Sequence, residues 1–245
     1  GRMDVYYPES SEKPVPVFIN IHGGAWRKGV KESQRDFKMF FQMGWGVANI
    51  EYRLAPKYTA PAAIEDCRCA LIYLVNNSSK FNIDPMNIVI GGTSAGGHLA
   101  LMAGILPDEN IFQNNCKPER QFKIASIINK YGITDMHDLL EGANKKDYSI
   151  VWIDKKKGDR EFINLVSPIF HINEKTPPVI TVHGDADPTV PYSHALKLHK
   201  KLNEYKIPNE LVTVKNGLHG KFSPDENKAV KEKVKEFLMK HTVSD

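Results

Sequence analysis

Residues 88 to 100 read Ile88-Val89-Ile90-Gly91-Gly92-Thr93-Ser94-Ala95-Gly96-Gly97-His98-Leu99-Ala100. The first three residues are apolar and β-branched, which is typical of a buried strand, and this run stops at two glycines. After the serine, small residues give way to Leu99, Met102 and Ala103 at helical spacing. The stretch therefore predicts a strand, a tight turn and a helix.

The turn at residues 92–96 has the pattern Gly-x-Ser-x-Gly, which is the pattern of a nucleophile elbow. Small neighbours let the strand and the helix approach closely, so that the Ser94 hydroxyl can project above the sheet. The N-terminus of the helix also directs free N–H groups toward the place where an oxyanion would form. The same residues also fit a glycine-rich turn that binds phosphate. Motifs elsewhere in the chain are needed to choose between a nucleophile elbow and a phosphate-binding turn.

A nucleophilic serine needs a base and an orienting carboxylate. Residues 178–182 predict a later strand, which opens into a loop with two aspartates, Asp185 and Asp187. We favour Asp187 as the orienting carboxylate because Asp185 is placed to cap the turn with its short side chain. After the last predicted strand, residues 211–214, His219 lies on a loop flanked by glycines, where packing gives little reason for a histidine. We therefore predict that His219 is the base.

The apolar run at residues 16–21 predicts a central strand that is covered on both faces. It ends at His22-Gly23-Gly24-Ala25-Trp26, where glycines let the main chain come close to a substrate oxygen. We expect backbone N–H groups of this loop to form half of an oxyanion hole. His22 is expected to brace the loop rather than to react. Trp26 fits either the core or a wall of the substrate cleft, and we favour the cleft.

Predicted strands alternate with predicted helices along most of the chain, which favours an α/β fold with a mainly parallel sheet. Such sheets keep their chemistry at the carboxyl ends of the strands, and each motif above lies at one of those ends. From about residue 135 to residue 170 the alternation lapses, so we expect a small helical, cap-like insertion over the site. No linker-like tract divides residues 1–245, so we expect a single domain.

The 245 residues carry a net charge of +4, with lysines scattered over predicted helices. Aromatic residues are not interleaved with a basic stripe, so we expect a solvated surface and no nucleic-acid partner. No apolar run approaches the length of a membrane span. Asp135, His137 and Asp138 lack a fourth ligand and a known metal-binding spacing, so we expect no metal there.

The chain has three cysteines. Cys67 and Cys69 lie two apart on a predicted helix, where their side chains diverge, so we expect neither a disulfide nor a metal site between them. We expect Cys67 to pack in the core and Cys116 to be alone, which leaves the redox compartment open. The chain opens without the charged and apolar regions of a signal peptide. Residues 4–8 resemble the end of a strand, so we expect the chain to begin inside the first hairpin of the domain.

Together these residues resemble the α/β-hydrolase fold and, within it, the hormone-sensitive-lipase-like esterases, in particular a compact bacterial branch with feruloyl and acetyl-xylan esterases. The resemblance covers nearly the whole chain. It rests on motifs at strand ends and in the flanking loops, namely His22-Gly23-Gly24-Ala25-Trp26, Glu51-Tyr52-Arg53-Leu54-Ala55-Pro56, residues 61–67, residues 92–97, Ser167-Pro168-Ile169, residues 177–178 and residues 183–191.

The family's serine, acid and base fall on Ser94, Asp187 and His219, in agreement with the choice made from the residues. The resemblance implies oxyanion donors on the backbone around Gly24 and Ala25, with Ala95 after the nucleophile. It also implies a secreted or periplasmic serine carboxylesterase without a cofactor, acting on short-chain or aryl esters such as acetyl or feruloyl groups on plant polysaccharide. Two departures from the family's pattern limit what the resemblance implies. The long N-terminal cap of the larger lipase-like members is absent, and Ala25 replaces the third glycine of their H-G-G-G motif.

Other functions are compatible with parts of this pattern. Arylformamidases share the H-G-G-x-W loop and remain an alternative. Prolyl peptidases share the aspartate loop, but the chain has no propeller-like repeats. An alternative of another class is a hydrolase fold that only binds a ligand. Such proteins typically lack a triad member, whereas all three are present here. The oligomeric state and the preferred acyl and alcohol groups stay open at this stage.

Overall fold

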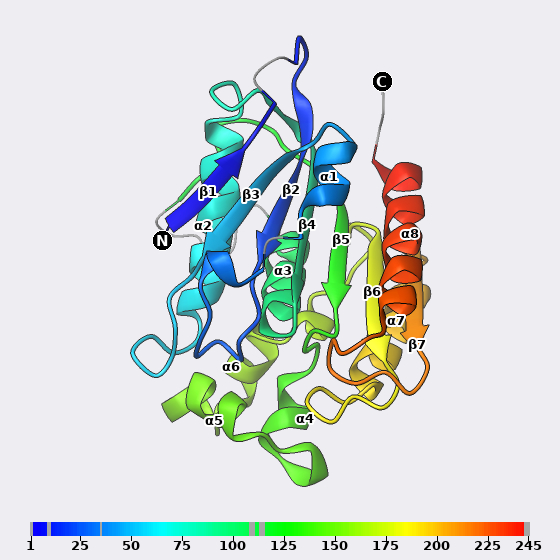
Figure 1. Cartoon of the computed structure of the whole chain (residues 1–245). Coiled ribbons are helices and arrows are strands. Elements are labelled where there is room, and N and C mark those ends of the chain that lie inside the picture. The colour runs from blue at the N-terminus through cyan, green and yellow to red at the C-terminus, as the bar shows by residue number, and fades with distance from the viewer. Residues whose placement is uncertain (1, 9–10, 35, 108–110, 113–115, 243–245) are drawn as a thin grey trace.

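The computed structural model describes residues 2–8, 11–34, 36–107, 111–112 and 116–242. Its centre is a seven-stranded sheet with the order β1-β3-β2-β4-β5-β6-β7 (Figure 1). The pairs from β3 to β7 are parallel and only the pairing of β1 with β3 is antiparallel, within these residues. The predicted α/β fold with a mainly parallel sheet is confirmed. The strands are β1 (Arg2–Tyr6), β2 (Val15–Ile21), β3 (Gly46–Glu51), β4 (Ile83–Thr93), β5 (Ile124–Lys130), β6 (Val179–Gly184) and β7 (Asn209–Val214).

Helices cover both faces of the sheet, which is why the central strands are predominantly apolar on both faces rather than alternating. On one face, α2, α3 and α7 pack over the sheet and share a large core with it. On the other face, α1 and α8 enclose a second, smaller core around Phe18 and Ile128. The longer helices are α1 (Lys38–Gln42), α2 (Ala62–Asn76), α3 (Ala95–Ile105), α4 (Met136–Leu140), α5 (Asp147–Ile153), α6 (Arg160–Leu165), α7 (Ser193–Glu204) and α8 (Pro224–His241).

A group of short helices follows β5, where the sequence predicts a helical insertion. Figure 1 shows α4, α5 and α6 beyond the carboxyl ends of the strands. The N-termini of α4 and α6 are capped by Asp135 and Asp159, whose side chains accept hydrogen bonds from backbone amides in the first turn. None of the helices among the described residues combines the length and apolar character needed to cross a membrane.

The first strand pairs with a strand that is distant in the chain. β1 pairs antiparallel with β3, so that Arg2 lies opposite Glu51 and Tyr6 opposite Val47. β2, the next strand along the chain, is separated from β1 by β3. β1 therefore forms its ladder with a strand more than 40 residues away rather than with its neighbour in the chain.

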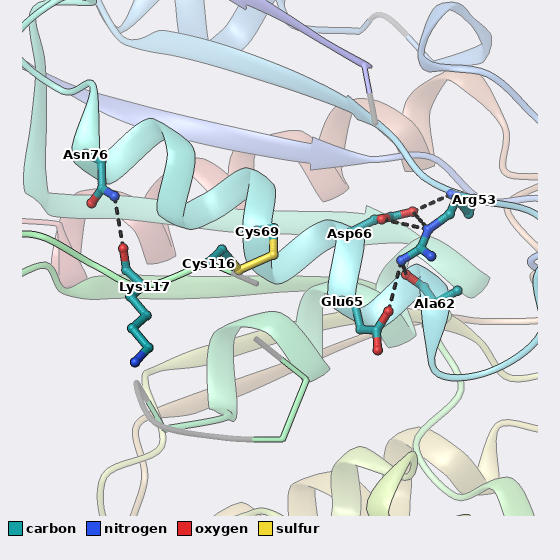
Figure 2. The surroundings of a disulfide bond; sticks show 8 residues. All are labelled: Arg53, Ala62, Glu65, Asp66, Cys69, Asn76, Cys116 and Lys117. Carbon is teal, nitrogen blue, oxygen red and sulfur yellow. Dashed lines mark hydrogen bonds and ion pairs between the residues drawn. A yellow bond between two sulfur atoms is a disulfide. The ribbon is translucent and has the colours of Figure 1, made fainter. Parts of the chain in front are cut away.

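One cysteine prediction is also wrong. Cys116 forms a disulfide with Cys69 of α2, across 47 residues of chain (Figure 2). The two α-carbons lie 5.4 Å apart, which is within the range that a disulfide requires. Figure 2 also shows Asn76, farther along α2, donating to the carbonyl of Lys117, so two contacts hold this segment against the helix. Cys67 is free and buried, which confirms its predicted place in the core.

Candidate active site

Ser94 occupies the turn between β4 and α3 with a strained backbone. Its φ of 55° and ψ of −121° lie in a region that residues with a side chain seldom adopt. The turn is held from both sides, because the Ser94 amide donates to the Lys130 carbonyl at 2.9 Å and its carbonyl accepts from the His98 amide at 3.0 Å. A β-carbon on Gly92 or Gly96 would overlap the Ile21 carbonyl oxygen. These glycines therefore let β2, β4 and α3 meet behind the serine.

Three side chains from distant parts of the chain meet at the carboxyl ends of the strands. The Ser94 hydroxyl oxygen lies 2.9 Å from Nε2 of His219. On the other side of the ring, Nδ1 lies 2.6 Å from Oδ2 of Asp187. When Nδ1–H donates to the carboxylate, the Nε2 lone pair faces the serine hydroxyl, which is the arrangement that a general base needs.

The Asp187 carboxylate is fully enclosed and its oxygens are occupied. Oδ1 accepts from the backbone amides of Thr189 at 2.8 Å and Val190 at 3.0 Å. Burial by itself would raise the pKa of Asp187, but hydrogen bonds with His183 and His219 outweigh it and hold that pKa well below its usual range. Asp187 therefore carries its negative charge beside the imidazole at neutral pH.

The loop with Asp187 and the loop with His219 are tied to each other. Oδ1 of Asp185 accepts a hydrogen bond of 2.5 Å from the Asn216 amide, and the Ala186 amide donates to the Gly217 carbonyl at 3.2 Å. A β-carbon on Gly184 would overlap the carbonyl group of Gly217. The two loops are in contact, so His219 is held at its carboxylate partner by backbone packing as well as by the side-chain pair.

The structure separates the two aspartates that compete in the sequence. Asp187 contacts the imidazole, whereas Asp185 caps the loop after β7 and is exposed. Asp185 therefore caps a turn, as its short side chain suggests. Its partner, however, is the neighbouring loop rather than its own turn.

The loop after β2 presses its backbone against the elbow. A β-carbon on Gly23 would lie 2.8 Å from the Thr93 carbonyl oxygen and 3.4 Å from the Ser94 β-carbon. Gly24 has a φ of 122°, and its carbonyl accepts from the amides of Arg27 and Lys28. A β-carbon there would overlap the Lys28 carbonyl. The loop therefore meets the elbow at Gly23, and the tight turn at Gly24 and Ala25 follows directly in the chain.

His22 braces this loop. Its ring is completely buried and stacks on Tyr52, with the ring centroids 4.3 Å apart. Nδ1–H is 2.7 Å from the Gly23 carbonyl oxygen, which accepts the hydrogen bond, and the Tyr52 hydroxyl donates to the His22 carbonyl. Burial lowers the pKa of His22, so the ring is neutral at physiological pH. The structure thus supports a bracing role.

The expectation that Trp26 lines the substrate cleft is wrong. Trp26 is 0% exposed and stacks on Trp152 of α5, with ring centroids 4.3 Å apart. Its indole N–H donates to Nδ1 of His98 at 3.3 Å, and Nε2–H of His98 donates to the Val166 carbonyl. Trp26 therefore belongs to the core, because the indole covers the junction of α3 with the inserted helices and satisfies its polar atom there.

Two residues around the imidazole were not singled out from the sequence. The ring of Tyr131 lies edge-on to His219, with centroids 4.7 Å apart, and burial raises the pKa of Tyr131 to about 12. His183 places Nε2 3.0 Å from the Val190 carbonyl and 3.4 Å from Oδ2 of Asp187. Both residues lie at the carboxyl end of a strand or directly after it. This position in the sequence could have marked them as neighbours of the site.

The acidic residues at the start of α4 do not gather around a common centre. Asp135 caps the helix, His137 lies 2.7 Å from the Asn164 side chain, and Asp138 pairs with His194 at 3.1 Å. Across the described parts of the chain, no three His, Cys, Asp or Glu side chains are grouped so that they could hold a metal ion.

Sequence comparison identifies families and individual proteins that are similar to this chain. Residues 3–202 match the BD-FAE family, and residues 163–245 match the family described as TAP-like protein. Esterase LipC of Mycobacterium tuberculosis is 30% identical over 196 residues, which are 78% of this chain and 49% of the relative. The isoprenylcysteine alpha-carbonyl methylesterase ICME of Arabidopsis thaliana is 25% identical over 241 residues, 89% of this chain and 53% of the relative. The chain thus spans about half the length of the curated relatives it matches.

Solved structures give a similar result. A truncated form of a carbohydrate esterase from gut microbiota is 25% identical, with a TM-score of 0.82, 97% of this chain covered and 90% of that chain. The acetyl ester-xyloside bifunctional hydrolase from Caldicellulosiruptor lactoaceticus is also 25% identical, with a TM-score of 0.71 and coverage of 97% and 84%. With the BD-FAE match extending over residues 3–202 and this likeness in structure, the chain belongs to the BD-FAE family and has the α/β-hydrolase fold.

Proposed function

We propose that this protein is a serine carboxylesterase in which Ser94 is the nucleophile, His219 the general base and Asp187 the orienting carboxylate. The observation that carries the proposal is the distance of 2.9 Å between the Ser94 hydroxyl oxygen and Nε2 of His219, with Nδ1 of the same ring 2.6 Å from Asp187. The esterase names of the relatives support the same reaction class.

The reaction divides into two acyl transfers. In the first, His219 takes the hydroxyl proton while the Ser94 oxygen bonds to the ester carbonyl carbon, and a tetrahedral oxyanion forms. This intermediate collapses when its bond to the alcohol oxygen breaks, and His219 returns the proton to that oxygen. In the second, His219 takes a proton from water while the water oxygen bonds to the acyl carbon. The bond from that carbon to the Ser94 oxygen then breaks, His219 returns the proton to the Ser94 oxygen, and the acid is released. Asp187 stabilises the imidazolium in both steps, because its carboxylate is ionised and aimed at Nδ1.

The developing oxyanion requires N–H donors that are fixed before the reaction. Ala95, the first residue of α3, has an amide in the first helical turn, where backbone N–H groups have no partner within the helix. Gly23, which precedes the turn at Gly24 and Ala25, lies against the same elbow. We assign these backbone amides to the oxyanion hole. Losing one such donor raises the barrier by about 3 kcal/mol.

For the substrate, we propose short-chain or aryl esters, with acetyl or feruloyl groups carried on a plant polysaccharide as the first candidates. The support is the pair of solved structures described as a carbohydrate esterase and as an acetyl ester-xyloside hydrolase. Hydrolysis rates for acetyl, butyryl and feruloyl esters, with and without a xylan backbone, test this choice. N-formylkynurenine in the same panel tests for arylformamidase activity.

The replacement Ser94→Ala tests the proposed reaction. It removes the nucleophile, and we expect p-nitrophenyl acetate hydrolysis to fall to the background rate, with an unchanged circular dichroism spectrum. A fluorophosphonate probe should label Ser94 in the wild-type protein and leave the variant unlabelled. A Ser94→Ala protein that keeps a near-wild-type rate, or a wild-type protein that the probe does not label, would remove the proposal.

A further inference from the structure

A cavity lies on the face of the sheet covered by α1 and α8. Its volume is about 350 Å³, and residues of β2, β4 and β5 form its floor. Phe18, Phe40 and Ile128 contribute apolar walls, with the Phe18 and Phe40 rings stacked at 3.9 Å between centroids. Ser94, Asp187 and His219 are not among its lining residues. The cavity is therefore distinct from the triad, although Thr93, the residue before the nucleophile, forms part of its wall.

Lys130 places an amine in this cavity. It follows Ile128 by two residues on β5, so both side chains point to the same face of the sheet, and it lies opposite Thr93 in the strand register. Its side chain makes no hydrogen bond or ion pair with any residue in the described part of the chain. Burial lowers the pKa of Lys130, with Lys231 acting in the same direction and Asp36 against it.

The other charges at the cavity are already paired. Lys231 of α8 contacts Asp36 at 2.6 Å, and both side chains are about half exposed or more, so this pair forms part of the outer rim. Thr93 and Gln34 hydrogen-bond through their side chains, and Asn20 donates to Asn49 at 2.8 Å. Lys130 thus lines a cavity of mixed polar and apolar character without a charged partner of its own among the described residues. A charge in that position is stabilised when an anion pairs with it.

We propose that this cavity binds a small carboxylic acid, whose carboxylate pairs with the Lys130 ammonium while its apolar body packs against Phe18, Phe40 and Ile128. A volume of about 350 Å³ is at the lower end of the range for small-molecule sites. The apolar walls favour an acid with a hydrocarbon or aromatic body over inorganic phosphate, which would leave those walls uncovered. The proposal does not depend on the esterase function, because no residue of the triad takes part.

Isothermal titration calorimetry with benzoate tests this site. We expect binding in about the millimolar range to the wild-type protein. Replacing the amine in Lys130→Met and in Lys130→Gln should weaken benzoate binding about tenfold or more, because a charged partner is lost. The matched control is Lys200→Met, which removes an exposed lysine of α7 and should bind benzoate like the wild type. Benzyl alcohol has the same ring but no charge. Its affinity should therefore be the same for the wild type and for all three variants.

Further measurements locate the site and check the fold. Thermal unfolding should show that Lys130→Met is as stable as the wild type or more stable, because the substitution removes an unpaired charge. Ser94→Ala and His219→Ala should bind benzoate as the wild type does, whatever their esterase activity. The proposal is overturned if benzoate does not bind at tens of millimolar, or if its affinity is independent of residue 130. It also fails if His219→Ala removes binding, or if inorganic phosphate binds more tightly than benzoate.

Discussion

The Asp185 carboxylate accepts a hydrogen bond of 2.5 Å from the backbone amide of Asn216, and this bond joins the loop that carries Asp187 to the loop that carries His219. The imidazole has no secondary structure of its own to hold it, because Asn216 to Gly220 form a turn between β7 and α8. Its position relative to Ser94 therefore depends on contacts between the two loops.

Removing the acceptor in Asp185→Ala should lower kcat for p-nitrophenyl acetate by about 10- to 100-fold, because small displacements of a catalytic group are costly. Asp185→Asn keeps a side-chain oxygen that can accept from Asn216 and should retain most of the activity. KM should change little in both variants, since Asp185 does not contact the serine. Equal rates for the alanine and asparagine variants would show that the bond does not position His219.

A side chain at residue 24 should disrupt the loop beside the nucleophile. In Gly24→Ala the new β-carbon meets the Lys28 carbonyl, and the φ of 122° disfavours alanine. We expect kcat to fall by about 100-fold or more as an oxyanion donor moves. Gly44→Ala is the control, because Gly44 also has a positive φ but its β-carbon would have no neighbour within 4 Å. It should lose about 1 kcal/mol of stability and no activity. Similar kcat values for the two variants would argue against oxyanion donors in this loop.

The buried position of Trp26 predicts an effect on stability. Trp26→Ala removes an indole that is fully enclosed and stacked on Trp152, and it should lower the free energy of unfolding by about 3–5 kcal/mol. Phe41→Ala removes an aromatic ring that is 48% exposed and should cost much less. Urea denaturation measures both. If Trp26→Ala kept its stability but changed KM between acetyl and feruloyl esters, Trp26 would belong to the cleft after all.

The Asp138–His194 pair predicts an acid-sensitive contribution to stability. The hydrogen bond with His194 is the main cause that lowers the pKa of Asp138 to about 2. A lowered pKa means that the pair stabilises the fold above the unfolded-state pKa of about 4, and that this contribution is lost as the pH falls toward 2. Asp138→Asn should therefore show a flatter decline of the unfolding temperature over this interval than the wild type.

The control for this pH series is Asp147→Asn, which changes an exposed carboxylate of α5. It should follow the wild-type profile. If the Asp138→Asn profile also coincided with that of the wild type, the pair would make no pH-dependent contribution to folding.

Local patterns in the sequence were sufficient to predict the central strands and the tight turn at Ser94. A continuous apolar run produces a strand covered on both faces wherever it occurs, and Gly-Thr-Ser-Ala-Gly permits a tight turn because of its own small side chains. Each of these features depends on neighbours in the chain, so it can be inferred without knowing the fold.

Contacts between distant segments were decided only by the tertiary structure. The sequence shows Cys69 and Cys116 as unrelated, and folding brings their α-carbons to 5.4 Å. Trp26 is compatible with cleft or core until α5 supplies Trp152 as its stacking partner. The sequence does not show that Lys130 lines a cavity, because that cavity forms only when α1 and α8 cover the sheet. Residue type and spacing determine which side chains can react or pack, but partners and burial depend on which surfaces meet when the sheet closes against its helices.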